Sequence, residues 1–174
     1  MSKGNDNPYA SPMTKPVQHQ QSGPGQLASL GDRFLGSFLD GLIVMVPFFI
    51  IMFVIGIALG MAGLQVGTLA FQVVSLVLSF VMFNVVYLGI NGYFLATKGQ
   101  TVGKMIVKTQ IVGEDGALVP FGQLYLKRYL ALWLVSFIPY VGYVVGLVDA
   151  LLVFRGNRKC LHDEIAGTKV ISLK

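Results

Sequence analysis

Two long runs of apolar residues, separated by a short uncharged turn, dominate the first half of the chain. Residues 34–60 contain a single charged side chain, Asp40, and residues 68–97 contain none. Ser29 and Asp32 have the S-x-x-D spacing of a capping box, which predicts a helix that begins near Leu30. At 1.5 Å per residue each run spans roughly 40 Å or more, which exceeds the ~30 Å hydrocarbon core of a bilayer. We therefore predict two membrane-spanning helices, over residues 30–60 and 68–97.

The second half of the chain alternates between polar and apolar segments. Residues 98–120 form a basic loop in which residues 107–112, VKTQIV, alternate well enough for a short strand. Two shorter apolar helices are predicted over 121–138 and 141–154, separated by Pro139. Residues 168–173 form a second candidate strand, which would pair with the first. The predicted fold class is an all-α integral membrane protein, a four-helix transmembrane bundle with a small cytoplasmic β-element.

The positions of the positive charges predict the orientation. Eleven of the thirteen Lys and Arg residues lie in the N-terminal segment, the 98–120 loop or the C-terminal tail, and the 60–67 turn has none. Because cytoplasmic segments carry the excess of Lys and Arg, both termini and the loop are expected in the cytoplasm, with the chain in the plasma (inner) membrane. The last two helices then cross an even number of times. Two full spans are favoured, and a re-entrant hairpin is the alternative.

Composition agrees with a membrane protein of one domain. The chain is 54% hydrophobic and 12% charged, whereas soluble domains are about 25% charged. Residues 1–28 carry four prolines and a glutamine run, which is typical of a disordered cytoplasmic tail, and residues 29–174 form the transmembrane domain. The net charge of +5 would suit nucleic acid, but no Lys or Arg occurs between Arg33 and Lys98. We expect the lipid bilayer as partner and no nucleic acid.

Ionisable and amide side chains inside the predicted helices are the main candidate functional residues. Asp40, Asn91, Arg128 and Asp149 each lie about 10 Å along their helices, which predicts one polar layer. In a transport site Asp40 and Asp149 would bind a cation or proton, Arg128 would tune their pKa values, and Arg33 would gate the cytoplasmic mouth. In a static site Arg128 would bridge the two aspartates. A third alternative is that Lys127 and Arg128 extend to the membrane interface from a helix at the surface.

Two glycine pairs, Gly56-x-x-x-Gly60 and Gly142-x-x-x-Gly146, predict close helix contacts within one protomer or between copies. Residues 99–104, GQTVGK, are one residue short of a phosphate-binding P-loop, and Met105 replaces the required Ser or Thr. Phosphate binding is therefore not expected.

The chain offers little that predicts catalysis or a bound cofactor. Three adjacent side chains, His162, Asp163 and Glu164, would point in different directions on a helix or strand, which disfavours a metal site. Cys160 is the single cysteine, so no internal disulfide can form. The sequence contains no Ser-His-Asp, HExxH or cysteine cluster, and we expect neither an enzyme nor a cofactor.

Three segments carry a resemblance to a known family. They are LASLGDRFLGSFLDGLIV at 27–44, GQTVGKMIVKTQIVGEDG at 99–116 and RKCLHDEIAGTKVI at 158–171. Together they resemble the RDD family of small bacterial membrane proteins, named for an arginine and two aspartates. The resemblance matches Arg33 to the arginine and Asp40 to the first aspartate, and leaves Asp149 and Asp163 as alternatives for the second. Met105 departs from the family loop, in which Lys or Arg often follows Gly-Lys.

The molecular role of the family is largely undefined. Cation/proton antiport has been proposed for some members, so the resemblance implies transport of monovalent cations or protons, or a transport-associated role. The rival hypothesis is a non-transporting scaffold or accessory subunit, acting as a homo-oligomer or with another membrane protein. The small number of polar groups in the outer halves of the predicted helices favours the rival.

Overall fold

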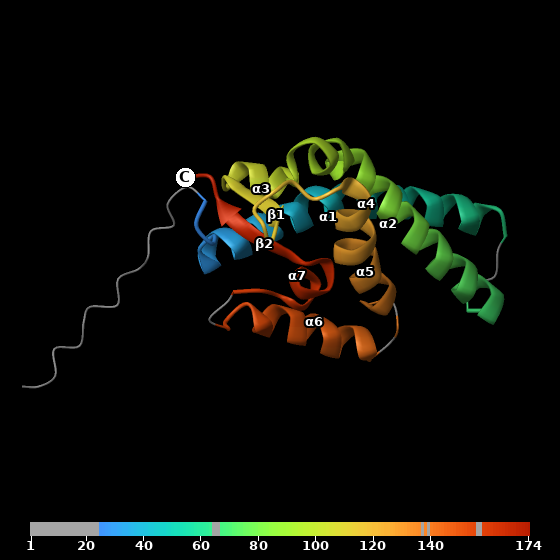
Figure 1. The fold of residues 1–174 in the computed structure, drawn as a ribbon. Coiled ribbons are helices and arrows are strands. Elements are labelled where there is room, and N and C mark those ends of the chain that lie inside the picture. Colours follow the sequence, from blue (N-terminus) through green and yellow to red (C-terminus); the bar gives the residue numbers. More distant parts are fainter. Residues whose placement is uncertain (1–24, 64–66, 137, 139, 156–157) are drawn as a thin grey trace, which may run out of the picture.

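Two long helices form the body of the molecule (Figure 1). The computed structural model describes residues 25–63, 67–136, 138, 140–155 and 158–174. Helix α1 spans Leu30–Met61 and α2 spans Leu69–Lys98, which confirms both predicted helices. The hydroxyl of Ser29 accepts a hydrogen bond from Asp32 N at 3.0 Å, so the Ser29 half of the predicted capping box is present. Helix α2 ends at Gly99, whose φ of 60° is the left-handed conformation that terminates many helices.

Helices α1 and α2 expose their apolar side chains. Only 6% of the residues in the apolar stretch of each helix are buried, and these two are the helices among the described residues that are long and apolar enough to cross a membrane. In water such a surface would be strongly unfavourable, so it is suited to contact with lipid or with apolar helices. The structure thus supports a mostly helical chain with two candidate spans, and it does not confirm four.

The third and fourth predicted helices are present but short. A continuous helical segment consists of α4 (Phe121–Gln123), the π-helix η1 (Leu124–Leu130) and α5 (Ala131–Ser136), and α6 follows at Val141–Leu152. The first of these extends about 24 Å and α6 about 18 Å, both less than the ~30 Å hydrocarbon core. Pro139, expected to separate them, lies outside the described residues.

The two predicted strands pair. Strand β1 (Thr109–Gly113) and strand β2 (Thr168–Ser172) are antiparallel, with Ile111 opposite Val170 at the centre. Leu27 forms an isolated bridge to Ile171, and Ala28 N donates to Val170 O at 2.9 Å. Residues 25–28 therefore lie along β2, while residues 1–24 of the predicted disordered tail lie outside the described residues. A small core forms beneath the sheet, made of Ala28, Leu95, Ile111, Val119, Leu124 and Val170.

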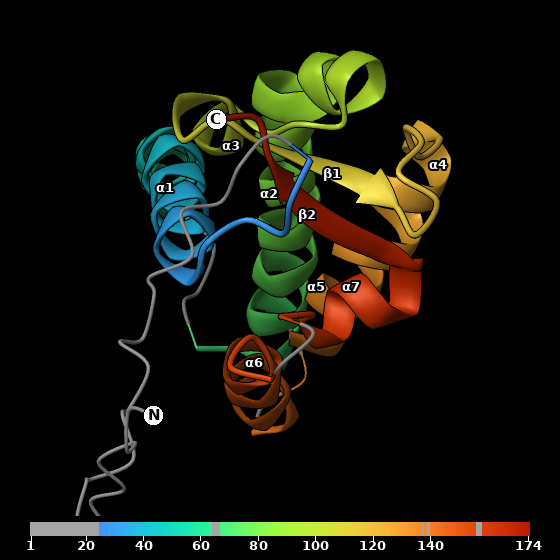
Figure 2. The same cartoon turned by 60° about the vertical axis from the view of Figure 1, so that its left-hand side comes forward.

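Two short helices, α3 (Val102–Ile106) and α7 (Leu161–Ala166), were not predicted. Helix α3 packs against α1, where a Cβ on Gly103 would clash with the backbone oxygen of Gly36. In Figure 2 the sheet and α3 lie beside the part of α1 where that helix begins. This end of the molecule holds most of the buried polar side chains.

The two predicted glycine pairs behave differently from expectation. A Cβ added at Gly56, Gly60 or Gly146 would meet nothing within 4 Å, so these positions make no close helix contact in the protomer. Gly142 does lie against the backbone, at the Ser136 carbonyl, because α6 turns back on α5 there. The prediction of intraprotomer GxxxG contacts is therefore wrong for three of the four glycines.

Candidate functional site

Asp163 is the centre of a buried ionic cluster. Its Oδ2 accepts a hydrogen bond from Arg33 Nη2 at 2.7 Å, and its Oδ1 pairs with Arg128 Nη1. The same Arg128 nitrogen also donates to the Thr168 hydroxyl. The side chain of Asp163 is 0% exposed and that of Arg128 is 2% exposed. We call Arg33, Arg128, Asp163 and Thr168 the Asp163 cluster.

The ionisation of Asp163 follows from its neighbours. Burial raises the pKa of its carboxyl group, but the charges of Arg128 and Arg33, together with that of His162 when acid protonates it, lower the pKa well below its ordinary value of 3.8. The backbone N–H of Cys160, 3.2 Å from Oδ2, adds a further donor to the ionised form. Asp163 is therefore a carboxylate at neutral pH, and it joins α1, η1 and α7 through one side chain.

Arg128 reaches this cluster from a π-helical segment. Residues Leu124–Leu130 make i→i+5 hydrogen bonds, which shift the side chains out of the register of an ordinary α-helix. Leu124 and Arg128 are the buried residues of this segment. Segments of this kind occur frequently at functional sites. Here the π-helical segment carries Arg128, the second of the two arginines that pair with Asp163.

Asp40 lies in a second cluster, at the contact between α1 and α3. Its Oδ1 accepts a hydrogen bond from Gly103 N at 2.7 Å, and its Oδ2 accepts one from the Thr101 hydroxyl. Lys104 Nζ lies 3.4 Å from Oδ2. We call Asp40, Thr101, Gly103 and Lys104 the Asp40 cluster. The GQTVGK segment does hold an anion through a backbone N–H and a lysine, but that anion is the chain's own carboxylate.

Asn91 supports the same segment from α2. It is fully buried, and its Oδ1 accepts a hydrogen bond from Val102 N, the first residue of α3, at 2.9 Å. Within the described part of the chain its Nδ2 has no hydrogen-bond partner. Asn91 therefore caps α3, which carries Gly103 and Lys104 of the Asp40 cluster and is directly preceded by Thr101.

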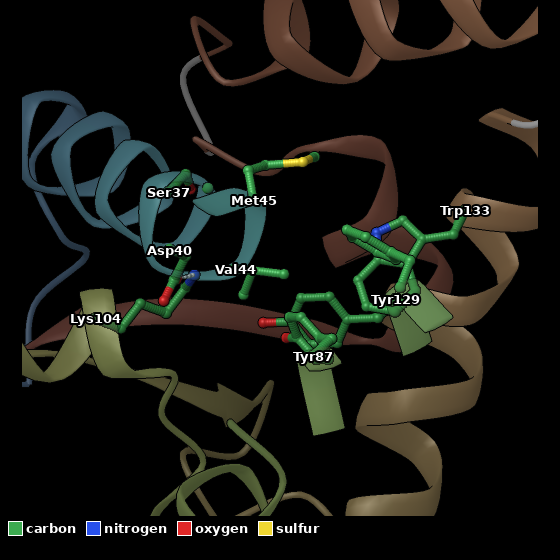
Figure 3. Close-up of a pocket in the computed structure, with 10 residues that line it drawn as sticks. Ser37, Asp40, Val44, Met45, Tyr87, Lys104, Tyr129 and Trp133 are labelled. Atoms are coloured by element: carbon green, nitrogen blue, oxygen red, sulfur yellow. Dashed lines mark hydrogen bonds and ion pairs between the residues drawn. The ribbon is translucent and has the colours of Figure 1, made fainter. Parts of the chain in front are cut away.

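A cavity of about 190 Å³ opens beside Asp40. Figure 3 shows Asp40 and Lys104 at one side of it and the rings of Tyr87, Tyr129 and Trp133 at the other. The remaining lining residues are Ser37, Gly41, Val44, Met45 and Phe83. The hydroxyls of Tyr87 and Tyr129 are buried and lie near each other, and neither makes a hydrogen bond of regular geometry with the residues that the structure describes. The cavity thus combines aromatic faces, two buried hydroxyls and one ion pair.

Asp149 pairs with a histidine, away from this cavity. His162 Nδ1 lies 2.8 Å from Asp149 Oδ1, and the His162 backbone N donates to the same oxygen at 3.0 Å. Burial and the positive charge of Arg128 lower the pKa of His162 below its ordinary value of 6.5. The imidazole is therefore neutral at pH 7, with its proton on Nδ1 and directed at the carboxylate.

The single polar layer predicted from depth does not form. Asp40 and Asn91 are brought together through α3, but Arg128 has its ion pair with Asp163, so the predicted pairing of Arg128 with Asp40 or Asp149 is wrong. Arg33 joins Arg128 rather than the Asp40 carboxylate. The prediction was based only on depth along each helix, and it did not include the π-helical segment or α7. These two elements place the Asp163 carboxylate beside both Arg33 and Arg128.

Several residues of the two clusters, of the cavity and of the pair with Asp149 were not identified as site residues from the sequence. They are Thr101, Lys104, Tyr87, Tyr129, His162 and Thr168. For Thr101, Lys104, His162 and Thr168 the signal was present in the segments that carry the family resemblance, because GQTVGK supplies donors to Asp40 and LHDEIAGT supplies His162, Asp163 and Thr168. The tyrosines sit within apolar helices and gave no such signal.

Comparison with known proteins extends the resemblance over most of the chain. The sequence profile of the RDD family matches residues 27–167. The uncharacterized protein YxaI of Bacillus subtilis (strain 168) is 34% identical over 148 residues, which cover 80% of this chain and 93% of that protein. The uncharacterized protein RP437 of Rickettsia prowazekii (strain Madrid E) is 30% identical over 98 residues, covering 52% of this chain and 51% of that protein. No solved structure matches.

Proposed function

This chain belongs to the RDD family, and on that premise we propose that it is a multi-pass protein of the plasma (inner) membrane that binds a monovalent cation or a proton in the cavity beside Asp40 and takes part in its transport. The observation that carries the proposal is the cavity itself. It is the place where a carboxylate of an apolar helix, two buried hydroxyls and several aromatic faces meet.

The chemistry of the lining suits a small cation. A carboxylate and tyrosine hydroxyls are oxygen ligands for a desolvated cation, and aromatic faces attract cations through their quadrupoles. Phe83, Tyr87 and Trp133 form a chain of edge contacts, with ring centroids 4.9 Å and 4.6 Å from Trp133. An ion that entered this space would contact Asp40 on one side and aromatic rings on the other.

Lys104 gives the site a means of exchange. Its ammonium is 3.4 Å from the Asp40 carboxylate, longer than the 2.7 Å pair between Arg33 and Asp163. A cation or proton that binds Asp40 competes with Lys104, whose long stem allows the ammonium to move away. Gly103 N and the Thr101 hydroxyl would still hold the carboxylate in place. The occupied and empty states then differ mainly in the position of one lysine.

The topology we propose has two full spans and a hairpin. Helices α1 and α2 cross the bilayer, and the segments 121–136 and 141–152, too short to cross, enter and leave on the same side as a re-entrant hairpin. The distribution of Lys and Arg supports an orientation in which both termini are cytoplasmic. Two spans cannot enclose a path by themselves, so transport would need a homo-oligomer or a membrane-protein partner, for which the exposed apolar faces of α1 and α2 are available.

Trp133 permits a direct test of cation binding, since it is the only tryptophan and it lines the cavity. The purified protein in nanodiscs would be titrated with Na⁺, K⁺ and acid while tryptophan emission is recorded. Saturable changes are expected for the wild type and for the control Glu164→Gln, whose carboxylate is exposed and pairs with Arg155. Asp40→Asn should abolish the response. Lys104→Gln should shift it to lower cation concentration, because the internal competitor is gone.

The rival function, a non-transporting scaffold, is favoured by one observation. The Asp40 carboxylate already has a backbone, a hydroxyl and an ammonium donor, so it can serve as a fixed joint between α1 and α3. Under this hypothesis emission of Trp133 is unchanged by any cation or pH, and liposomes show no flux under Na⁺, K⁺ or proton gradients. That combined result would exclude the transport proposal for this chain acting alone.

A further inference from the structure

A second group of ligand-type side chains lies where α6 approaches α7. Asp149, Cys160 and His162 each offer one ligand atom, and these atoms all lie within 4.8 Å of one another. All three residues are half-buried. None of them lines the cavity beside Asp40, so this group is separate from the proposed cation site.

Three contacts set the geometry of this group. Asp149 comes from α6, Cys160 occupies the N-cap position of α7, and His162 lies in the first turn of α7. The His162 backbone N–H holds the Asp149 carboxylate at 3.0 Å, and the ring Nδ1 lies 2.8 Å and 2.9 Å from its two oxygens. The carboxylate and imidazole are therefore already positioned against each other, with the thiol beside them.

We propose that Asp149, Cys160 and His162 form a binding site for a borderline-soft divalent metal ion such as Zn²⁺. Thiolate and imidazole favour such ions over Mg²⁺ and Ca²⁺, which prefer sites made only of oxygen ligands. Three protein ligands with a fourth position open is a common arrangement for zinc outside purely structural sites. Carboxylate and thiolate together supply two negative charges, which balance the ion.

Metal binding rearranges two protons. The ion replaces the proton on His162 Nδ1 that is hydrogen-bonded to Asp149. The neutral imidazole then carries its single proton on Nε2. The Cys160 thiol releases its proton to solvent, since the thiolate is the metal ligand. The neighbouring guanidiniums of Arg33 and Arg128 are both directed at Asp163, which leaves the three ligands free of a competing ion pair with arginine.

The single cysteine makes the site directly measurable, because every thiol reaction of the protein reports on Cys160. Full-length protein in detergent would be alkylated with a maleimide at increasing Zn²⁺. Wild type and the control Glu164→Gln should be protected, with the rate falling roughly tenfold or more at saturation. Asp149→Asn and His162→Gln should require at least about tenfold more Zn²⁺ for the same protection. Melting temperatures without metal would show that each variant is folded.

Cobalt provides a second measurement that does not depend on thiol access. Co²⁺ added to wild type should give a sulfur-to-cobalt absorption band in the near ultraviolet, and the isosteric Cys160→Ser should lack it. If Asp149 and His162 only tie α6 to α7 by hydrogen bonds, Zn²⁺ gives no protection and Co²⁺ gives no such band, which overturns the proposal. Equal protection of wild type and His162→Gln would likewise overturn it.

Discussion

Asp163 lies in a closed cluster, whereas Asp40 lies at the wall of a cavity. Asp163 receives two guanidiniums and is completely buried, and the three elements that it joins come from distant parts of the chain. Asp40 receives a backbone N–H, a hydroxyl and a more distant ammonium, and its side chain is 12% exposed. The Asp163 carboxylate therefore has no room to change its partners. The Asp40 carboxylate faces the cavity on the side where Lys104 lies, so its cationic partner can change.

This difference separates structural from exchangeable carboxylates. A buried carboxylate fixed by two planar guanidiniums costs much to release, because each arginine would remain charged and unpaired. A carboxylate fixed mainly by neutral donors can change its cationic partner while staying in place. We therefore assign stability to the Asp163 cluster and ligand exchange to the Asp40 cluster, and the following variants test that assignment.

The largest loss of stability is expected for Asp163→Asn. Removing the charge leaves Arg33 and Arg128 buried without a carboxylate, which should lower the free energy of unfolding by about 3–5 kcal/mol. Thermal melting in detergent would measure the change against Glu164→Gln, an exposed carboxylate on the next residue. A melting temperature for Asp163→Asn equal to that of the control would contradict the structural role of this cluster.

Gly103→Ala should be the next most harmful change. An added Cβ would overlap the Gly36 backbone oxygen and lie 2.8 Å from the Asp40 carboxyl carbon, so α3 must move away from α1. Overpacking of this kind costs about 1–3 kcal/mol. Gly56→Ala is the matched control, because nothing lies within 4 Å of its Cβ position. If both variants melt alike, the close contact between α1 and α3 is not formed.

Asp40→Asn should affect stability less than either. The amide oxygen can still accept from Gly103 N, and Lys104 can turn toward the cavity, so a loss of about 1 kcal/mol is expected. Cation-dependent changes in Trp133 emission should nevertheless disappear. A loss of stability as large as that of Asp163→Asn would show that Asp40 is also a fixed structural pair.

Of these changes, a lower pH should cause the smallest loss of stability, through the Asp163 cluster. Because the pKa of Asp163 is lowered on folding, its contribution is fully present above about pH 5 and is lost as the pH falls below the unfolded-state value toward the folded one. The loss should reach about 1 kcal/mol by pH 3. Between pH 6 and pH 3 the melting temperature should therefore fall more steeply for wild type than for Asp163→Asn. Parallel curves would contradict the lowered pKa.

Much of the scaffold could be predicted from local patterns. The uncharged runs predicted α1 and α2 to within one residue at each end, and the alternation in residues 107–112 predicted the strand that pairs with β2. These features depend on short-range periodicity, which one sequence displays directly. The four-span bundle was inferred from the apolar segments and from the distribution of Lys and Arg, and the lengths of the last two helical segments do not confirm it.

The partners of the charged residues could not be predicted in the same way. Arg33 and Asp163 are 130 residues apart in sequence, and their contact depends on a six-residue helix and on a π-helical segment that has no clear periodicity of its own. The tail was expected to end at residue 28, yet Leu27 and Ala28 lie against β2 because β2 offers an unpaired edge. Contacts between residues so far apart in sequence depend on how the elements pack, which local patterns in the sequence do not display.

The separation between Arg33 and Asp163 also sets an order of events during synthesis. At ribosomal speeds of roughly 5–20 residues per second, the arginine emerges on the order of ten seconds before its carboxylate. Arg128, which precedes Asp163 by 35 residues, must wait as well. Arg33 therefore spends this interval without its carboxylate and Arg128 a shorter one, and α7 with β2 completes the structure last.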